Sequence, residues 1–275
     1  MKTTSLFHVF RNTPFGRDTL LQSVYFARKL DLPITLYIPK HQQFIMHFTN
    51  ASVTVDLDRG FLASQETARL HAENILLEND IKTHFFEPTN FTSLDLPDVP
   101  ASCSYMCCPR SISDLSTKIG MGYIGPKVRQ IVQNAGFPVL IPTPVYKEWH
   151  RVVAFFGGSE NAVKAVKLAA REAKASGLPL HLFTKSENKP QTEYEDLLLH
   201  NGLKEVLENQ IENWLFFSEG KFNELLYEVP SDALVVLGAY GHGAIKEILF
   251  GSKMEEIQSV LPNNMLIIGP YCQVL

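Results

Sequence analysis

The segment that decides the fold lies near the C-terminus, where a short apolar run leads into a series of glycines: Ala233-Leu234-Val235-Val236-Leu237, then Gly238-Ala239-Tyr240-Gly241-His242-Gly243. An unbroken apolar run of this length is typical of a buried parallel strand. Helix formers follow from Ala244 to Phe250, and then Gly251-Ser252. Strand, glycine turn and helix together form a context in which backbone amides can surround a phosphate. The spacing, G-x2-G-x9-G-S, therefore predicts an anion site in a parallel α/β fold.

Neither standard nucleotide fingerprint fits this segment. The P-loop requires Lys followed by Ser or Thr after its last glycine, whereas here Ser252 precedes Lys253. The dinucleotide pattern G-x-G-x-x-G has no match at this turn. A glycine-rich turn also occurs where a strand and a helix simply pack closely, so the spacing alone leaves packing and phosphate binding open.

Composition excludes several classes of protein. The 275 residues are 45% hydrophobic and 20% charged, as in soluble globular proteins, and they suffice for two domains. The net charge of −4 argues against a generic nucleic-acid binder. No apolar run approaches the roughly 20 residues that span a bilayer, and the N-terminal apolar run is too short for a signal peptide. We therefore expect a cytoplasmic protein that binds neither nucleic acid nor membrane.

Three of the four cysteines cluster in a predicted buried strand, at Cys103, Cys107 and Cys108. In an extended strand, Cys103 and Cys107 face the same way but lie roughly 13 Å apart, and Cys108 faces the other side. One zinc ion cannot join thiolates that far apart, and no histidine cluster stands nearby. We expect buried structural cysteines, and the sequence requires no metal.

Strands and helices alternate in both halves of the chain. In the second half we expect strands over 151–156, 178–184, 211–217, 233–237 and 265–268, and helices over 162–176, 193–210 and 221–228. In the first half we expect strands over 6–10, 33–38, 82–86, 102–107 and 139–141, and helices over 16–30, 65–79 and 127–134. Such alternation predicts parallel sheets, and a repeat of about 130 residues suggests duplication. Prolines in 142–149 mark a linker, so we place the domains at 1–146 and 147–275.

The segment 238–256, with Leu261-Pro262-Asn263-Asn264-Met265-Leu266-Ile267-Ile268-Gly269 after it, resembles the nucleotide-binding motif of the universal stress protein family. The repeat extends the resemblance over the whole chain, as a tandem member. The family fold implies two doubly wound α/β domains, each a five-stranded parallel sheet with helices on both faces. Strands 1 and 4 would then be adjacent, where strand order reverses and ligands usually bind.

The resemblance also implies which residues hold a nucleotide. In family members that bind ATP, this motif holds the phosphates and the ribose of the nucleotide. The turn after strand 1 lies across the crevice from the motif. Lys253 could bring a cation to the phosphates or remain solvated. The cofactor-binding positions on this sequence are Gly157, Gly238, Tyr240, Gly241, Gly243, Gly251, Ser252 and Lys253.

The chain departs from the family pattern in both halves. Gly157 stands where the family commonly has an Asp that contacts the nucleoside, and Thr184-Lys185 replaces an apolar lining beside the adenine. In the first half, Cys108-Pro109-Arg110-Ser111 replaces the glycines, and Pro126 has no amide hydrogen. We expect a degenerate first domain without nucleotide. Arg110 could attract an anion there, although a solvent-exposed arginine is the default expectation.

The resemblance implies a stress-response regulatory protein that binds an adenine nucleotide (ATP, ADP or AMP) at a single surviving site in the C-terminal domain. The alternative is a nucleotide-free interaction scaffold with the same fold. The sequence shows no nucleophile–base pair, so we expect at most slow ATP hydrolysis or autophosphorylation; His242 is the one histidine placed for chemistry. Its protein partners are unknown. Family dimers imply an internal pseudo-dimer through 139–141 and 265–268, or a homodimer.

Overall fold

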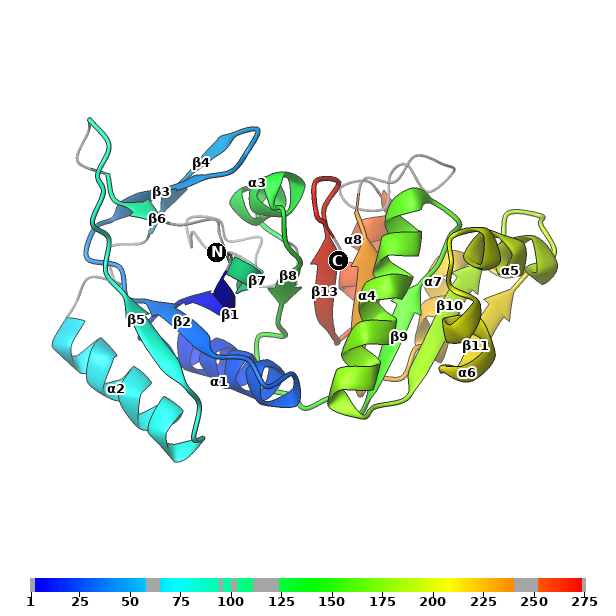
Figure 1. Ribbon diagram of the computed structural model, residues 1–275, viewed down its shortest axis with the longest axis horizontal. Coiled ribbons are helices and arrows are strands. Elements are labelled where there is room, and N and C mark those ends of the chain that lie inside the picture. The colour runs from blue at the N-terminus through cyan, green and yellow to red at the C-terminus, as the bar shows by residue number, and fades with distance from the viewer. Residues whose placement is uncertain are drawn as a thin grey trace. The chain divides into compact units, whose positions relative to one another are not determined.

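The computed structural model describes residues 3–57, 65–93, 96–99, 103–110, 124–239 and 252–273. The chain divides into two compact units, Met1–Glu148 and Trp149–Leu275. Each unit contains a parallel sheet and helices (Figure 1). The predicted doubly wound α/β fold is therefore confirmed in both halves.

The sheet of unit 2 has five parallel strands in the order β11-β10-β9-β12-β13. Its central strands β10, β9 and β12 are buried except for one end residue each (Lys185, Arg151 and Gly238), as the apolar runs predicted. The strands are β9 (Arg151–Phe155), β10 (Leu180–Lys185), β11 (Ile211–Phe217), β12 (Ala233–Gly238) and β13 (Asn264–Ile268). The helices are α4 (Glu160–Ser176), α5 (Gln191–His200), α6 (Lys204–Asn209), α7 (Phe222–Leu225) and α8 (Ser252–Val260), with a 3-10 turn η3 (Leu226–Glu228).

Local sequence explains where the helices of unit 2 begin and end. The hydroxyl of Ser159 caps α4 by accepting from the amide of Ala162 at 3.1 Å, and Gly177 ends the helix at φ 66°. The prediction of a single helix over 193–210 was wrong. Two helices, α5 and α6, form instead, because the chain turns at Gly202, whose φ of 76° no helix can continue.

The sheet of unit 1 repeats this arrangement, with the parallel order β8-β7-β1-β2-β5. Its strands are β1 (Thr3–Val9), β2 (Ile34–Tyr37), β5 (Thr83–Phe86), β7 (Cys103–Cys107) and β8 (Val139–Ile141). Its helices are α1 (Pro14–Lys29), α2 (Gln65–Glu78) and α3 (Pro126–Asn134). Helices α1 and α2 lie side by side (Figure 1), joined by hydrogen bonds from Arg28 to the main chain and side chain of Asn79 at 3.0 and 2.9 Å.

A second small sheet in unit 1 was not predicted. It consists of β3 (Gln43–His47), β4 (Ser52–Asp56) and β6 (Asp98–Val99), in the order β4-β3-β6. Strands β3 and β4 form an antiparallel hairpin in which Phe44, Met46, Val53 and Val55 are buried and their neighbours are more exposed. This alternation is the signature of a strand with one buried face, so the signal was present in the sequence.

A buried side chain ties the two strands at the edge of unit 2 together. Asn263, before β13, is 0% exposed, and its Nδ2 donates to the carbonyls of Pro230, Ser231 and Ala233 at 2.9, 3.2 and 2.9 Å. The first two carbonyls belong to the turn that leads into β12, and the third is that of Ala233, the first residue of β12. The amide therefore fixes where both strands begin.

Asn263→Ala should lower the free energy of unfolding of unit 2 by about 2–4 kcal/mol, because it removes a buried donor from the carbonyls of Ser231 and Ala233, whereas the Pro230 carbonyl keeps the amide of Ala233 as a donor. Both tryptophans of the chain, Trp149 and Trp214, belong to unit 2, so urea unfolding followed by tryptophan fluorescence reports on this unit. Asn201→Ala is the control, since it removes an exposed amide bonded to the Leu197 carbonyl at 2.8 Å. The control should change stability by less than about 0.5 kcal/mol. Equal losses in the two variants would contradict this role for Asn263.

Candidate functional site

The candidate site lies where the strand order of unit 2 reverses. Strand β10, which follows β9 in the chain, pairs with one edge of β9, whereas β12 pairs with the other edge of β9. The register places Val236 opposite Ala154, so Gly238 and Phe156 are level at the carboxyl ends of the two strands. In an open α/β sheet this is the usual ligand crevice.

The turn after β9 combines two glycines with a helix cap. Gly158 has φ 81°, a left-handed backbone that strongly favours glycine, whereas Gly157 is not among the residues with positive φ. A Cβ on Gly158 would also lie 3.2 Å from the Cδ1 of Leu197, on α5. The left-handed backbone therefore favours glycine at 158, where a side chain would also crowd Leu197, while the conformation of Gly157 is open to other residues.

Gly238 lets β12 approach the first turn of α4. A Cβ at this position would overlap the backbone carbonyl of Asn161. The side-chain amide of Asn161, which is 6% exposed, donates to the carbonyl of Ala239. Packing thus explains the glycine at 238 by itself. Asn161 is a site residue that sequence reasoning missed, since an Asn in the first turn of a helix carries no distinctive signal.

The residues at the end of β10 are held by the protein itself. Thr184, 1% exposed, donates to the carbonyl of Phe156 at 2.8 Å and accepts from the indole of Trp214 at 3.0 Å. The ammonium of Lys185 donates to the carbonyls of Ser186 and Ser218 at 3.0 and 2.8 Å. The Thr184 side chain therefore lies inside the fold, and the replacement of an apolar lining beside the adenine by Thr184-Lys185 stays a prediction.

Aromatic side chains occupy the same side of the crevice. The ring of Tyr194, on α5, lies edge-on to the rings of Phe156 and Phe216, with ring centroids 6.0 and 5.7 Å apart. The rings of Trp214 and Phe216 are also edge-on, with centroids 6.2 Å apart. Tyr194 is 3% exposed. Helix α5 therefore closes over the turn after β9 from the β10 side.

Half of the predicted site residues fall within the described residues. Gly157 and Gly238 lie at the ends of neighbouring strands, and Ser252 and Lys253 are the first two residues of α8. Tyr240, Gly241, Gly243 and Gly251 lie outside the described residues, as does His242. The structure thus brings together the start of the glycine segment and the turn after β9.

The charge at the start of α4 is negative. Glu160 occupies the first turn, its side chain is 79% exposed, and its carboxylate lies 3.3 Å from the ammonium of Lys164. An acid at this position is stabilised by the helix dipole.

The equivalent crevice of unit 1 carries arginines instead of glycines. His8 of β1 is level with Cys107 of β7, and Arg11 and Arg110 each lie three residues beyond that pair. Both arginines are only 7% exposed, and burial lowers the pKa of Arg110 to about 10. The expectation of a solvent-exposed Arg110 was wrong. The absence of nucleotide from this half stays a prediction.

Unit 1 also contains a serine–histidine contact that the sequence did not reveal. The Nδ1 of His8 lies 2.8 Å from the hydroxyl of Ser23, and the thiol of Cys107 also bonds to Ser23. These side chains are at most 1% exposed, and burial lowers the pKa of His8 to about 3 and raises that of Cys107 to about 12. The geometry resembles a nucleophile with its base, yet no substrate can reach it, so the contact is a hydrogen bond of the core.

All four cysteines are buried, as expected for structural residues. Among the residues that the structure describes, no group of three or more His, Cys, Asp or Glu side chains could hold a metal ion. Nor does any described helix combine the length and apolar character needed to cross a membrane.

Comparison with known proteins gives one curated relative and several solved structures. No family model matches the sequence. The chain is similar to the universal stress protein Slr1230 of Synechocystis sp., with 23% identity over 152 residues, which are 52% of this chain and 50% of that protein. The match therefore spans about half the length of this curated relative.

Two solved structures align with the chain over nearly its full length. A universal stress protein from Archaeoglobus fulgidus has a TM-score of 0.59 and 14% identity, over 98% of this chain and 99% of the other. The functionally unknown protein PA1789 from Pseudomonas aeruginosa has a TM-score of 0.58 and 12% identity, over 98% and 93%. At such identities the structures establish the fold alone. The chain therefore has the fold of these structures, and about half of it is similar in sequence to a universal stress protein.

Proposed function

We propose that this protein is a stress-response regulator that binds one adenine nucleotide, ATP, ADP or AMP, in the crevice of unit 2. The observation that carries the proposal is the spacing G-x2-G-x9-G-S, which starts at Gly238 on the last residue of β12. The carboxyl end of that strand lies beside the carboxyl end of β9, where α/β sheets bind ligands.

The first residues of the glycine segment are fixed in place, which favours binding. Ala239 donates to the carbonyl of Ile268 at 2.6 Å and accepts from the amide of Asn161. A binding segment anchored on both sides loses less conformational entropy when it orders around a ligand. The motif ends at Ser252, where α8 begins, so the amides of that first turn are available to a phosphate.

Charge suggests how the nucleotide lies. The Glu160 carboxylate makes the start of α4 less favourable for phosphate, although its ion pair with Lys164 and its exposure weaken this effect. We therefore place the phosphates along Gly241, Gly251 and Ser252, with Lys253 nearby, and the ribose beside Gly157. The cation of Lys253 would strengthen phosphate binding by a charge-assisted hydrogen bond.

The aromatic side of the crevice favours the second candidate, a nucleotide-free interaction scaffold. Thr184 and Lys185 are bonded to neighbouring backbone, and Tyr194 packs over the turn. Together with the missing acid at Gly157, this leaves fewer groups to recognise a nucleoside. Isothermal titration of the full chain with ATP, ADP and AMP decides between the candidates. One equivalent bound per chain supports the nucleotide site, two equivalents contradict the single site, and no heat favours the scaffold.

Two glycines of the motif should respond differently to substitution. Gly241→Val places a side chain where backbone must approach phosphate, so it should abolish nucleotide binding, as measured by titration, with the circular dichroism spectrum unchanged. Gly238→Ala is the matched comparison, because its Cβ would overlap the Asn161 carbonyl. It should lower the urea midpoint of unit 2. Unchanged nucleotide affinity in Gly241→Val would refute the placement of the phosphates.

The missing acid can be restored. Gly157→Asp should strengthen ATP binding by about 1–3 kcal/mol, because a carboxylate beside the ribose accepts hydrogen bonds from its hydroxyls. The backbone can accept Asp here, since the left-handed conformation falls on Gly158 instead. Gly157→Asn is the control, in which an uncharged amide should give a smaller gain. Weaker ATP binding in Gly157→Asp with an unchanged fold would mean that the ribose does not lie beside Gly157.

A further inference from the structure

The small sheet of unit 1 carries a serine, a histidine and an aspartate in a row on its exposed face. Ser52 lies on β4, His47 on β3 and Asp98 on β6, and these strands are adjacent in the order β4-β3-β6 (Figure 1). The Nδ1 of His47 lies 2.7 Å from the Oγ of Ser52, and its Nε2 lies 3.0 Å from the Oδ1 of Asp98. A hydroxyl, an imidazole and a carboxylate joined in this order are the parts of an activated serine nucleophile.

Strand pairing places the three side chains together. His47 and Ser52 are opposite each other in the hairpin, and Asp98 pairs with Ile45, two residues before His47. Residues two apart on a strand face the same way, so Asp98 and His47 share a face. The other face of the hairpin is the buried one. The three polar groups are therefore open to solvent, with the side chains of His47 and Asp98 51% and 30% exposed. Sequence reasoning missed them because His47 and Asp98 are 51 residues apart.

The two hydrogen bonds decide where the imidazole carries its proton. A carboxylate only accepts, so neutral His47 has its proton on Nε2 and donates it to Asp98. The Nδ1 of His47 then has a free lone pair, and it accepts from the hydroxyl of Ser52. The hydroxyl proton thus already points at the base that can remove it, which is the arrangement that a nucleophilic serine needs.

The backbone of the hairpin supplies a donor for negative charge that develops on a substrate. The amide of Phe48 donates to the carbonyl of Ala51 at 2.8 Å, so in an antiparallel ladder the next pair, His47 and Ser52, is not joined by main-chain hydrogen bonds. The amide of Ser52 therefore points to the outer edge of β4, where the described residues form no further strand. An amide at the nucleophile can stabilise the oxyanion that forms when its own hydroxyl attacks a carbonyl carbon.

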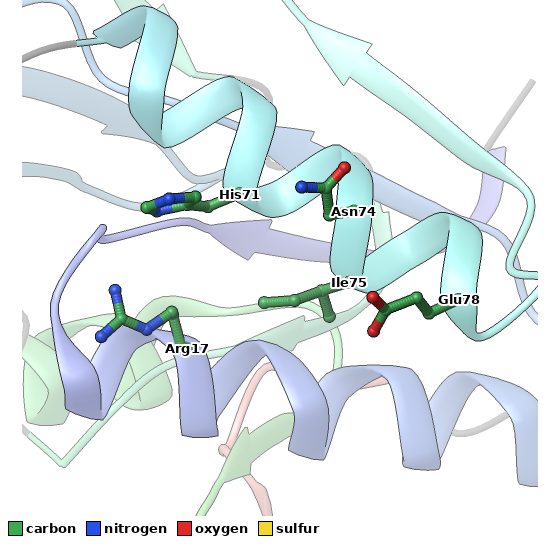
Figure 2. A pocket seen from close by; sticks show the side chains of 5 residues that line it. All are labelled: Arg17, His71, Asn74, Ile75 and Glu78. Atoms are coloured by element: carbon green, nitrogen blue, oxygen red, sulfur yellow. The ribbon is translucent and has the colours of Figure 1, made fainter.

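Two other histidines of unit 1 lack this combination. His8 also contacts a serine, but that pair is buried. His71 lies in the pocket between α1 and α2 that Figure 2 shows, which is lined by Arg17, His71, Asn74, Ile75 and Glu78. The Nδ1 of His71 lies 2.9 Å from the amide oxygen of Asn12, and among the described residues it bonds to no hydroxyl. His47 therefore combines a bonded serine with access from solvent, and His71 is its matched control.

We propose that Ser52 is a reactive serine that accepts an acyl group from an activated ester, with His47 as its base and Asp98 as the residue that positions His47. The Oγ of Ser52 attacks the carbonyl carbon of the ester, and the hydroxyl proton passes to the Nδ1 of His47. The bond from Ser52 to the acyl carbon forms as the bond to the leaving oxygen breaks. The imidazolium, stabilised by Asp98, then gives its proton to the leaving alkoxide or phenolate.

The surroundings favour an uncharged acyl donor over a phosphoryl donor. Phosphoryl transfer depends on cations that neutralise the transferred group. Among the described residues, no Lys or Arg side chain contacts Ser52, His47 or Asp98, and Asp98 is itself an anion. An ester carbonyl develops a single negative charge, which an amide donor can stabilise. The acyl group is therefore the electrophile that fits this site, which is independent of the nucleotide crevice of unit 2.

The test is the reaction of the full chain with p-nitrophenyl acetate. Phenolate release is followed by absorbance, and the acetyl group is located by peptide mass spectrometry after quenching with acid. Ser52 should be acetylated about 100-fold faster than Ser259, because general-base catalysis contributes at least about this factor. Ser259 is the internal control, since it is exposed and donates to the carbonyl of Glu256 at 3.0 Å instead of an imidazole. Reaction with p-nitrophenyl phosphate should leave Ser52 unmodified.

Three variants assign the roles, each with an unchanged circular dichroism spectrum. Ser52→Ala should remove the fast phase of phenolate release. His47→Gln should lower the acetylation rate of Ser52 about 100-fold, whereas the control His71→Gln should leave it unchanged. Asp98→Asn should lower the rate about tenfold, because an amide no longer selects the Nε2–H tautomer. Nitrogen NMR of the His47 ring should show this change of tautomer, which a purely structural role of Asp98 would not produce.

Three results would overturn the proposal. The first is acetylation of Ser52 no faster than that of Ser259. The second is an acetylation rate that His47→Gln and His71→Gln affect equally. The third is modification of Ser52 by p-nitrophenyl phosphate as fast as by p-nitrophenyl acetate, since that would exclude selection of an acyl donor.

Discussion

The close contact between the end of β12 and the first turn of α4 is the constraint on which unit 2 depends. Gly238 has no side chain, so the carbonyl of Asn161 can lie against it, and the amide of Asn161 then reaches the carbonyl of Ala239. This contact holds the ends of β9 and β12 level at the point where strand order reverses. A larger residue at position 238 would separate helix and sheet and open the core beneath the crevice. The geometry of the site is therefore a consequence of packing.

The same strand order supports different chemistry in the two units. In unit 1, a glycine of α1 again allows a close approach, since a Cβ on Gly16 would overlap the carbonyl of Arg11. The crevice beside it holds Arg11 and Arg110, both nearly buried, where unit 2 has glycines. The hairpin of β3 and β4 adds a second sheet that has no counterpart among the described residues of unit 2. A shared topology fixes where a site can form, and the residues at the strand ends decide what it can bind.

Buried polar groups in this protein serve the fold. His8 bonds to Ser23, Thr184 joins the Phe156 carbonyl to Trp214, and Asn263 bonds to three carbonyls. In a low-dielectric interior the loss of such a hydrogen bond is costly, so each bond favours one arrangement of its neighbours.

The sequence by itself determined the α/β class, the five parallel strands of each half and the positions of most helices, because apolar runs and glycine caps such as Gly177 act locally. It also placed Gly157 and Gly238 at the ends of two central strands. Only the tertiary structure decided that Arg110 is buried, that Asn161 bonds to Ala239 and that Thr184 points into the fold. Periodicity fixes the face of a strand or helix on which a residue lies. The residue that contacts a given side chain comes from a segment tens of residues away in the chain. Only the packing of the folded protein decides which residue that is.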